Sequence, residues 1–237
     1  MKPFGILKLG DYPGPSPVRE GDYEDWFIAS MGLSEEEVVI FDPRRGDPFP
    51  DPLSLQALVV SGSNSMVSDH ADWSLASEDF LRRVHAAGVP ILGICYGHQL
   101  LAEALGGKVG LNPRGREMGT IEVRFDEAAE SDPLFAGIGE VLEVQSMHSE
   151  TVLELPEGAV VLARSEGDDY QALRHGERAW SVQFHPELKA PEVSKVARDR
   201  AAAIRAEGLD PEAIAASTRE TPEAELILAR FARLARG

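Results

Sequence analysis

Short apolar runs alternate with stretches of helical periodicity along most of the chain. Residues 73–87 place Leu75, Phe80, Leu81 and Val84 on one helical face, and residues 23–29 begin a second helix that ends at Gly32. Alternation at this spacing predicts right-handed crossovers and a mostly parallel sheet. The apolar runs predict strands over residues 4–9, 38–41, 55–60, 89–94, 108–111, 121–125, 160–163, 170–173 and 180–184, with a further strand at the start of 141–150.

The composition changes from Pro191 onward to Ala, Arg and Glu with helical periodicity. Residues 192–207, 210–217 and 222–236 are expected to be helices, with a Pro near the start of each. The last one places Leu226, Ile227, Phe231 and Leu234 on one face. We therefore expect a main domain over residues 1–190 and a helical extension over 191–237 that packs on it.

One stretch joins a buried strand to a helix through the only cysteine of the chain. The strand over 89–94 leads into Cys95, and apolar residues follow at helical spacing from Gln99 until Gly106. Gly93 and Gly97 flank the cysteine at two positions on either side. Small residues at this spacing permit a sharp strand-to-helix turn that leaves a nucleophile exposed at its tip. The helix dipole there favours the reactive thiolate.

A second apolar strand, over 180–184, presents a base and an acid. His185 and Glu187 follow it at alternate positions, which share a side of an extended chain. Acyl transfer from an amide requires a nucleophile, a base and a group that orients the base. Cys95, His185 and Glu187 are thus the candidate catalytic residues.

These segments resemble the class I (triad type) glutamine amidotransferases, including the glutaminase domain of GMP synthase, over about residues 4–188. The motifs that carry the resemblance are Gly93-Ile94-Cys95-Tyr96-Gly97-His98-Gln99, Phe184-His185-Pro186-Glu187 and Ser61-Gly62-Ser63-Asn64-Ser65. The resemblance implies an α/β fold, a three-layer sandwich with a mostly parallel central sheet of the flavodoxin-like type, plus the C-terminal helices.

The resemblance also implies roles for residues around the nucleophile. The backbone N–H groups of Ser63 and Tyr96 would form the oxyanion hole, although Asn64 stands where the family often has Pro. Gln99, His148 and Ser149 match positions that bind the glutamine substrate. Residues 114–119 form an expected polar loop beside the site, in which no single charge has an assigned role.

Two activities fit these residues. The first is hydrolysis of the glutamine side-chain amide to glutamate and ammonia through a Cys95 thioester, with the ammonia passed to a separate synthetase, because no synthetase domain follows in the chain. The alternative is a γ-glutamyl peptidase or hydrolase with the same triad. An α/β-hydrolase would place its acid before the final His, and a non-catalytic module usually lacks one triad member.

Composition limits the other possibilities. The formal net charge of −17 argues against binding to nucleic acid. The chain contains no run of about 18 apolar residues, so the sequence predicts no membrane span. The single cysteine and the absence of a signal-like leader favour a reducing cytoplasm. The chemistry needs a small-molecule substrate but no cofactor and no metal, and the remaining histidines lack metal-ligand spacing.

Overall fold

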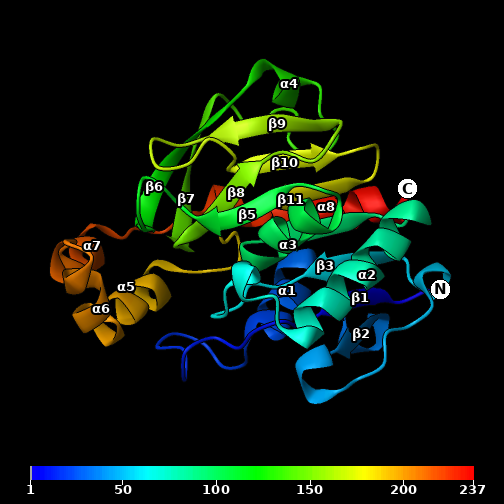
Figure 1. Cartoon of the computed structure of the whole chain (residues 1–237), viewed down its shortest axis with the longest axis horizontal. Helices are drawn as coiled ribbons and strands as arrows, with labels where there is room; N and C mark the ends of the chain where they lie inside the picture. The colour runs from blue at the N-terminus through cyan, green and yellow to red at the C-terminus, as the bar shows by residue number, and fades with distance from the viewer. Residues whose placement is uncertain (1) are drawn as a thin grey trace.

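The computed structural model describes residues 2–237 and builds them around a nine-stranded sheet (Figure 1). Its strands lie in the order β2-β1-β3-β4-β11-β10-β9-β6-β7, and β5 and β8 pair separately. The strands are β1 (Phe4–Leu7), β2 (Val38–Phe41), β3 (Ala57–Val60), β4 (Ile91–Ile94), β5 (Lys108–Leu111), β6 (Glu117–Phe125), β7 (Val141–His148), β8 (Glu150–Glu154), β9 (Ala159–Arg164), β10 (Ala172–His175) and β11 (Ala179–Val182).

Five strands, β2-β1-β3-β4-β11, pair in parallel, and the remaining four extend the sheet by antiparallel pairs. The order of the parallel strands is that of the flavodoxin-like doubly wound fold. The expected α/β sandwich is confirmed. In such sheets functional groups gather at the carboxyl ends of the parallel strands, so those ends are where a site is to be sought.

Helices cover both faces of the parallel strands and make the three layers. They are α1 (Tyr23–Met31), α2 (Asp72–Ala86), α3 (Tyr96–Ala104), α4 (Glu127–Glu130), α5 (Ala190–Asp199), α6 (Ala201–Ala206), α7 (Pro211–Ser217) and α8 (Pro222–Arg236). In Figure 1, α2 and α3 lie in front of the sheet and α8 passes behind it. Short 3-10 turns link several of these elements.

Side chains that alternate along each strand divide the hydrophobic core between the two faces of the sheet. Ile6 belongs to the cluster that includes Phe27 of α1 and Phe231 of α8, whereas its neighbour Leu7 belongs to the cluster that includes Phe80 of α2. All are buried. Successive side chains of a strand point to opposite faces, which produces this division.

Several sequence-based boundaries were wrong. The expected polar loop over 114–119 is in part strand, because β6 begins at Glu117 and pairs with β7 in the register Glu117↔His148. The strand β8 was not predicted, and the strand predicted over 170–173 runs over 172–175. The helix expected over 192–207 is broken at Arg200 into α5 and α6. Tertiary pairing, which local periodicity does not report, sets the strand boundaries.

No helix within residues 2–237 has both the length and the apolar character that crossing a bilayer requires.

Candidate active site

Three neighbouring parallel strands end at the same place. The loop Ser61–Ser63 follows β3, Cys95 follows β4, and His185 lies three residues beyond the end of β11. The pairs Val60↔Gly93 and Ile94↔Val182 fix these ends relative to one another. Segments from residues 61, 95 and 185 therefore meet at one edge of the sheet.

Cys95 occupies a strained turn between β4 and α3. Its φ of 52° and ψ of −103° are rarely adopted by a residue with a side chain, and such strain clusters at functional sites. The flanking glycines leave room for the turn. A Cβ on Gly93 would lie 2.5 Å from the Gly97 carbonyl oxygen, and one on Gly97 would lie 2.5 Å from the Val60 carbonyl oxygen. The elbow geometry expected from the glycine spacing is present.

His185 and Glu187 form a buried couple against the same loop. His185 Nδ1 lies 2.7 Å from Glu187 Oε1, and both side chains are almost fully buried. Gly62 lies against both this couple and the nucleophile: a Cβ there would lie 3.0 Å from His185 Cε1 and 3.8 Å from Cys95 Cβ. With Nδ1 directed at the carboxylate, the other ring nitrogen is left for a partner on the cysteine side.

The electrostatics of this group favour a thiolate–imidazolium pair. Burial on its own would raise the pKa of the Cys95 thiol, but the charge and hydrogen bond of His185 outweigh burial and lower it. Burial likewise opposes the charged form of His185, yet Glu187 and Cys95 raise its pKa to about 10. A thiolate next to an imidazolium is the reactive state of a cysteine nucleophile.

One cavity brings together the residues that the sequence placed at the site, apart from Glu187, which lies behind His185. Tyr96 is the first residue of α3, so its N–H has no acceptor within the helix and is free to face this space. The cavity is lined by Cys95, His185, Ser63, Tyr96, Gln99, His148 and Ser149, together with further residues that include Tyr23, Arg116, Met118, Val196 and Arg200.

The residues expected to bind the substrate differ in how many of their side-chain hydrogen-bonding groups already have a partner within the protein. Gln99 Nε2 donates to the Glu150 carbonyl oxygen at 2.7 Å and to Gln183 Oε1 at 2.9 Å. Both ring nitrogens of His148 also face protein acceptors. The side-chain N–H groups of Gln99 and His148 are therefore engaged within the protein, and Ser149 is left as the more open of the three.

The structure adds residues that sequence reasoning missed. The Tyr23 ring stacks on His185 with centroids 6.1 Å apart and planes 19° apart. Arg19 donates to the Glu187 carbonyl oxygen and to the buried Glu192 carboxylate. No motif marks Tyr23 or Arg19, because both come from the first quarter of the chain and approach the couple only through folding.

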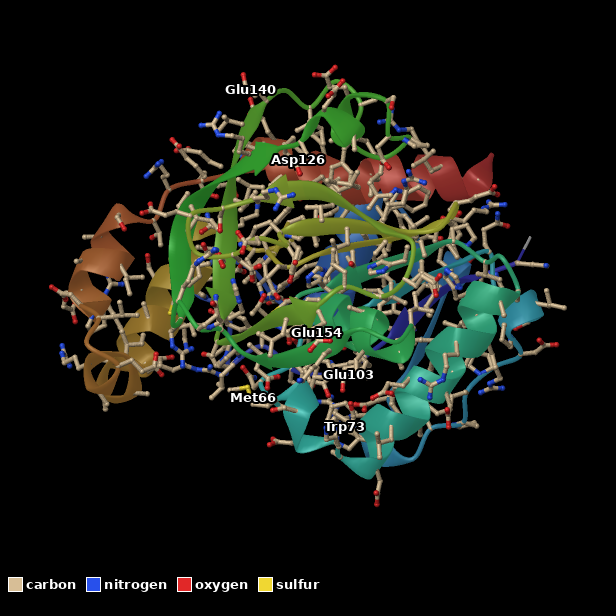
Figure 2. All side chains as sticks on the ribbon, turned by 45° about the horizontal axis from the view of Figure 1, so that its top comes forward. Met66, Trp73, Glu103, Asp126, Glu140 and Glu154 are labelled. Carbon is tan, nitrogen blue, oxygen red and sulfur yellow. The ribbon has the colours of Figure 1, made fainter. Side chains whose placement is uncertain are left out.

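The C-terminal helices border the cavity as well. Val196 of α5 and Arg200 line it, and Arg200 donates to Asn64 Oδ1 beside the expected oxyanion loop. Met66, whose sulfur is visible near the edge of the molecule in Figure 2, lines the cavity from the side of that loop. Within residues 2–237 no group of three or more His, Cys, Asp or Glu side chains is arranged to hold a metal ion.

Comparison with known proteins finds related sequences and structures. The chain is 34% identical over 170 residues to the glutamine-hydrolyzing GMP synthase of Staphylococcus aureus strain JH9, a match that covers 70% of this chain and 30% of that enzyme. The matched region therefore spans less than a third of the curated relative. A glutamine amidotransferase structure from Thermotoga maritima has a TM-score of 0.77 at 20% identity, with full coverage of both chains.

A glutamine amidotransferase structure from Methylobacillus flagellatus gives a TM-score of 0.71 at 24% identity, covering 99% of this chain and 91% of that one. At these identities the two structures support the fold alone. The family model for class I glutamine amidotransferases matches residues 51–200, which include the elbow, the His185–Glu187 couple and α5. This chain belongs to the class I glutamine amidotransferase family.

Proposed function

We propose that the chain hydrolyses the side-chain amide of glutamine through a thioester on Cys95. The Cys95 thiolate attacks the amide carbon, and the N–H groups of Ser63 and Tyr96 hold the oxyanion that forms. His185 donates its proton to the departing nitrogen, so ammonia leaves. His185 then removes a proton from water, which attacks the thioester, and glutamate and the thiolate are released.

The observation that carries this proposal is the shared cavity of Cys95 and His185 at the carboxyl ends of β4 and β11, with Glu187 bonded to the far side of the imidazole. Glu187 orients the ring and stabilises its charged form, as the acid of such a triad does. Each donor of an oxyanion hole contributes a factor of about 10² to 10³ in rate. Family membership supports glutamine as the substrate.

We further propose that the released ammonia serves a separate synthetase. The Staphylococcus aureus relative is named a glutamine-hydrolyzing GMP synthase, and this chain matches only 30% of it. Residues 191–237 hold an extension that borders the cavity, and we propose that they pack as part of the same unit as residues 1–190.

The test is the release of ammonia and glutamate by the purified chain, with L-glutamine compared against a panel of γ-glutamyl peptides at equal concentration. Cys95→Ser is expected to lower turnover of glutamine by roughly 10³-fold or more, because loss of a triad nucleophile removes most of the rate enhancement. Glu122→Gln, an exposed change on β6, is the matched control and should leave turnover unchanged.

Two results would contradict the proposal. Turnover within a few-fold of wild type in Cys95→Ser would exclude the thioester route. Cys95-dependent turnover that favours γ-glutamyl peptides over glutamine would instead identify a γ-glutamyl hydrolase with the same triad.

A further inference from the structure

A second imidazole–carboxylate pair lies buried beside the nucleophile and has no part in the proposed reaction. His148, at the end of β7, and Glu117, at the start of β6, face each other across the antiparallel pair. His148 Nε2 lies 3.0 Å from Glu117 Oε2. The side chain of His148 is 1% exposed and that of Glu117 is 11% exposed.

The hydrogen-bond partners of this pair determine its protonation. His148 Nδ1 lies 2.9 Å from the Glu150 carbonyl oxygen, which can only accept, so Nδ1 carries a proton. Glu117 accepts from Ser165 Oγ at 2.6 Å and from the Gln171 amide, as an ionised carboxylate does. Because Nε2 faces that carboxylate, it carries a proton too. An imidazole protonated at both nitrogens is an imidazolium.

This cation lies close to the nucleophile, while its counter-ion lies farther back. Cys95 Sγ is 3.9 Å from the carbonyl oxygen of Met147, the residue before His148, and His148 lines the same cavity as Cys95. Glu117 does not line that cavity, although its neighbours Arg116 and Met118 do. The imidazole of the pair therefore borders the cavity that holds the thiol, whereas its carboxylate does not.

We propose that Glu117 holds His148 as a permanent imidazolium beside Cys95, so that the nucleophile has a second positive charge besides His185. The assignment of charge stands on geometry alone, and its role in turnover rests on the proposed thioester reaction. Glu117 is a positioning residue in this scheme, because it acts on the sulfur only through His148.

A permanent cation can stabilise the thiolate throughout the cycle, which His185 cannot do. His185 must give its proton to the departing ammonia, so its charge is lost during each turnover. His148 has a carboxylate and a carbonyl as its partners and no nitrogen free for the substrate, and its charge therefore persists throughout the cycle. It favours thiolate formation before attack and thiolate departure when the thioester is hydrolysed.

The pKa shifts of His148 and of the groups around it agree with an imidazolium at this position. The groups that face His148 are Glu117 on β6, Asp168 between β9 and β10, Cys95 at the elbow and His98 on α3. Burial opposes a charge on His148, but Glu117 and Asp168 outweigh burial and raise its pKa. Burial also opposes ionisation of Glu117, yet His148 lowers the pKa of that carboxyl. The charge of His148 in turn favours the Cys95 thiolate, although less than that of His185 does.

The experiment measures alkylation of Cys95 by iodoacetamide against pH in wild type, Glu117→Gln, Glu117→Asp and the control Glu122→Gln. Glu117→Gln should move the midpoint of the alkylation profile up by about one pH unit, so the rate on the acid side falls about tenfold. Glu117→Asp keeps the charge and should recover most of the rate. A profile unchanged in a folded Glu117→Gln variant would overturn the proposal.

A second measurement is made on the wild-type protein and does not require Glu117→Gln to fold. Nitrogen NMR of wild-type protein labelled at its six histidines, with His148 assigned by its loss in His148→Gln, reports protonation directly. Two protonated ring nitrogens for His148 at pH 7.5 are expected, and a neutral ring would refute the assignment. Neither measurement needs turnover. If the glutaminase proposal failed but the charge assignment held, the protein would be inactive on glutamine while His148 still carried two protonated ring nitrogens.

Discussion

Cys95 is held by steric and by electrostatic constraints that come from different parts of the chain. Its backbone is forced into a positive φ by a turn that fits only because Gly93 and Gly97 lack side chains. Its ionisation is favoured by His185, which lies 90 positions later in the sequence. The turn fixes the position of the sulfur, and the imidazolium favours its ionised form. Loss of the turn should therefore reduce reactivity by misplacing the sulfur, and loss of the imidazolium by raising the pKa of the thiol.

Replacement of His185 tests the electrostatic constraint. In His185→Gln the Cys95 thiol keeps its burial, which raises its pKa, and loses the larger of the two charges that lower it. The pKa of the thiol should therefore rise above its wild-type value, and alkylation near neutral pH should slow by about tenfold or more. The rate of iodoacetamide modification against pH measures this directly.

In wild type the same profile should extend to lower pH than that of a free thiol. The His185 charge is present below its folded-state pKa of about 10, so the thiolate is favoured across the neutral range. An alkylation midpoint in wild type at or above that of free cysteine would contradict the ion pair. His85→Gln, a change at a surface helix away from the cavity, provides the control.

At the scale of elements, the final helix is part of the sandwich. The residues of α8 that face the sheet, Ile227, Leu228 and Phe231, are fully buried in the same core cluster as α1 and the central strands. The helix thus belongs to the same layer as α1, which it contacts, and it also contacts β7. By contrast, α5–α7 pack at one end, where α5 borders the cavity.

Phe231→Ala should be strongly destabilising, because removal of a fully buried aromatic ring leaves a cavity in the core. We expect the free energy of unfolding in urea to fall by about 3–5 kcal/mol. The sequence predicted Leu226 on the packed face, but this residue is 53% exposed. Leu226→Ala should therefore change the free energy of unfolding by less than about 1 kcal/mol. Equal effects of the two variants would mean that α8 is not packed as described.

At the scale of the whole molecule, the charge balance is strongly negative. The chain carries 40 acidic and 23 basic residues, and Figure 2 shows side chains such as Glu140 directed outward from the strands. Many basic residues are paired locally, as Arg44 is with Asp11 and Asp42. The unpaired excess is acidic, and its self-repulsion acts against the compact state.

Screening should therefore stabilise the protein. Between about 0.01 M and 0.15 M NaCl the Debye length falls from about 30 Å to about 8 Å, which suppresses repulsion between distant carboxylates. We expect the unfolding temperature to rise by a few degrees over this range, measured by calorimetry at constant pH. A fall would show that local ion pairs, which salt also weakens, outweigh the long-range repulsion.

The sequence alone was enough to predict the parallel strands and the sharp turn at Cys95. Apolar runs such as 57–60 and 91–94 are buried on both faces of the sheet. Such burial leaves a continuous hydrophobic pattern that can be recognised from the sequence alone. The elbow could be predicted because its requirement for small residues is local: two glycines and a nucleophile within five positions. His185 and Glu187 were found as candidates for the same reason, since they follow directly on a strand.

Only the tertiary structure decided how distant segments meet. Glu117 was predicted to lie in a loop, and β8 was not predicted, because their backbone hydrogen bonds are made with strands far along the chain. Tyr23 and Arg200 carry no motif and reach the cavity only through folding. Arg19, which also carries no motif, reaches the backbone of Glu187 in the same way. The nucleophile, the base and the acid can be recognised from their neighbours in sequence. The electrostatic environment and the lining of the cavity arise from contacts between residues far apart in sequence.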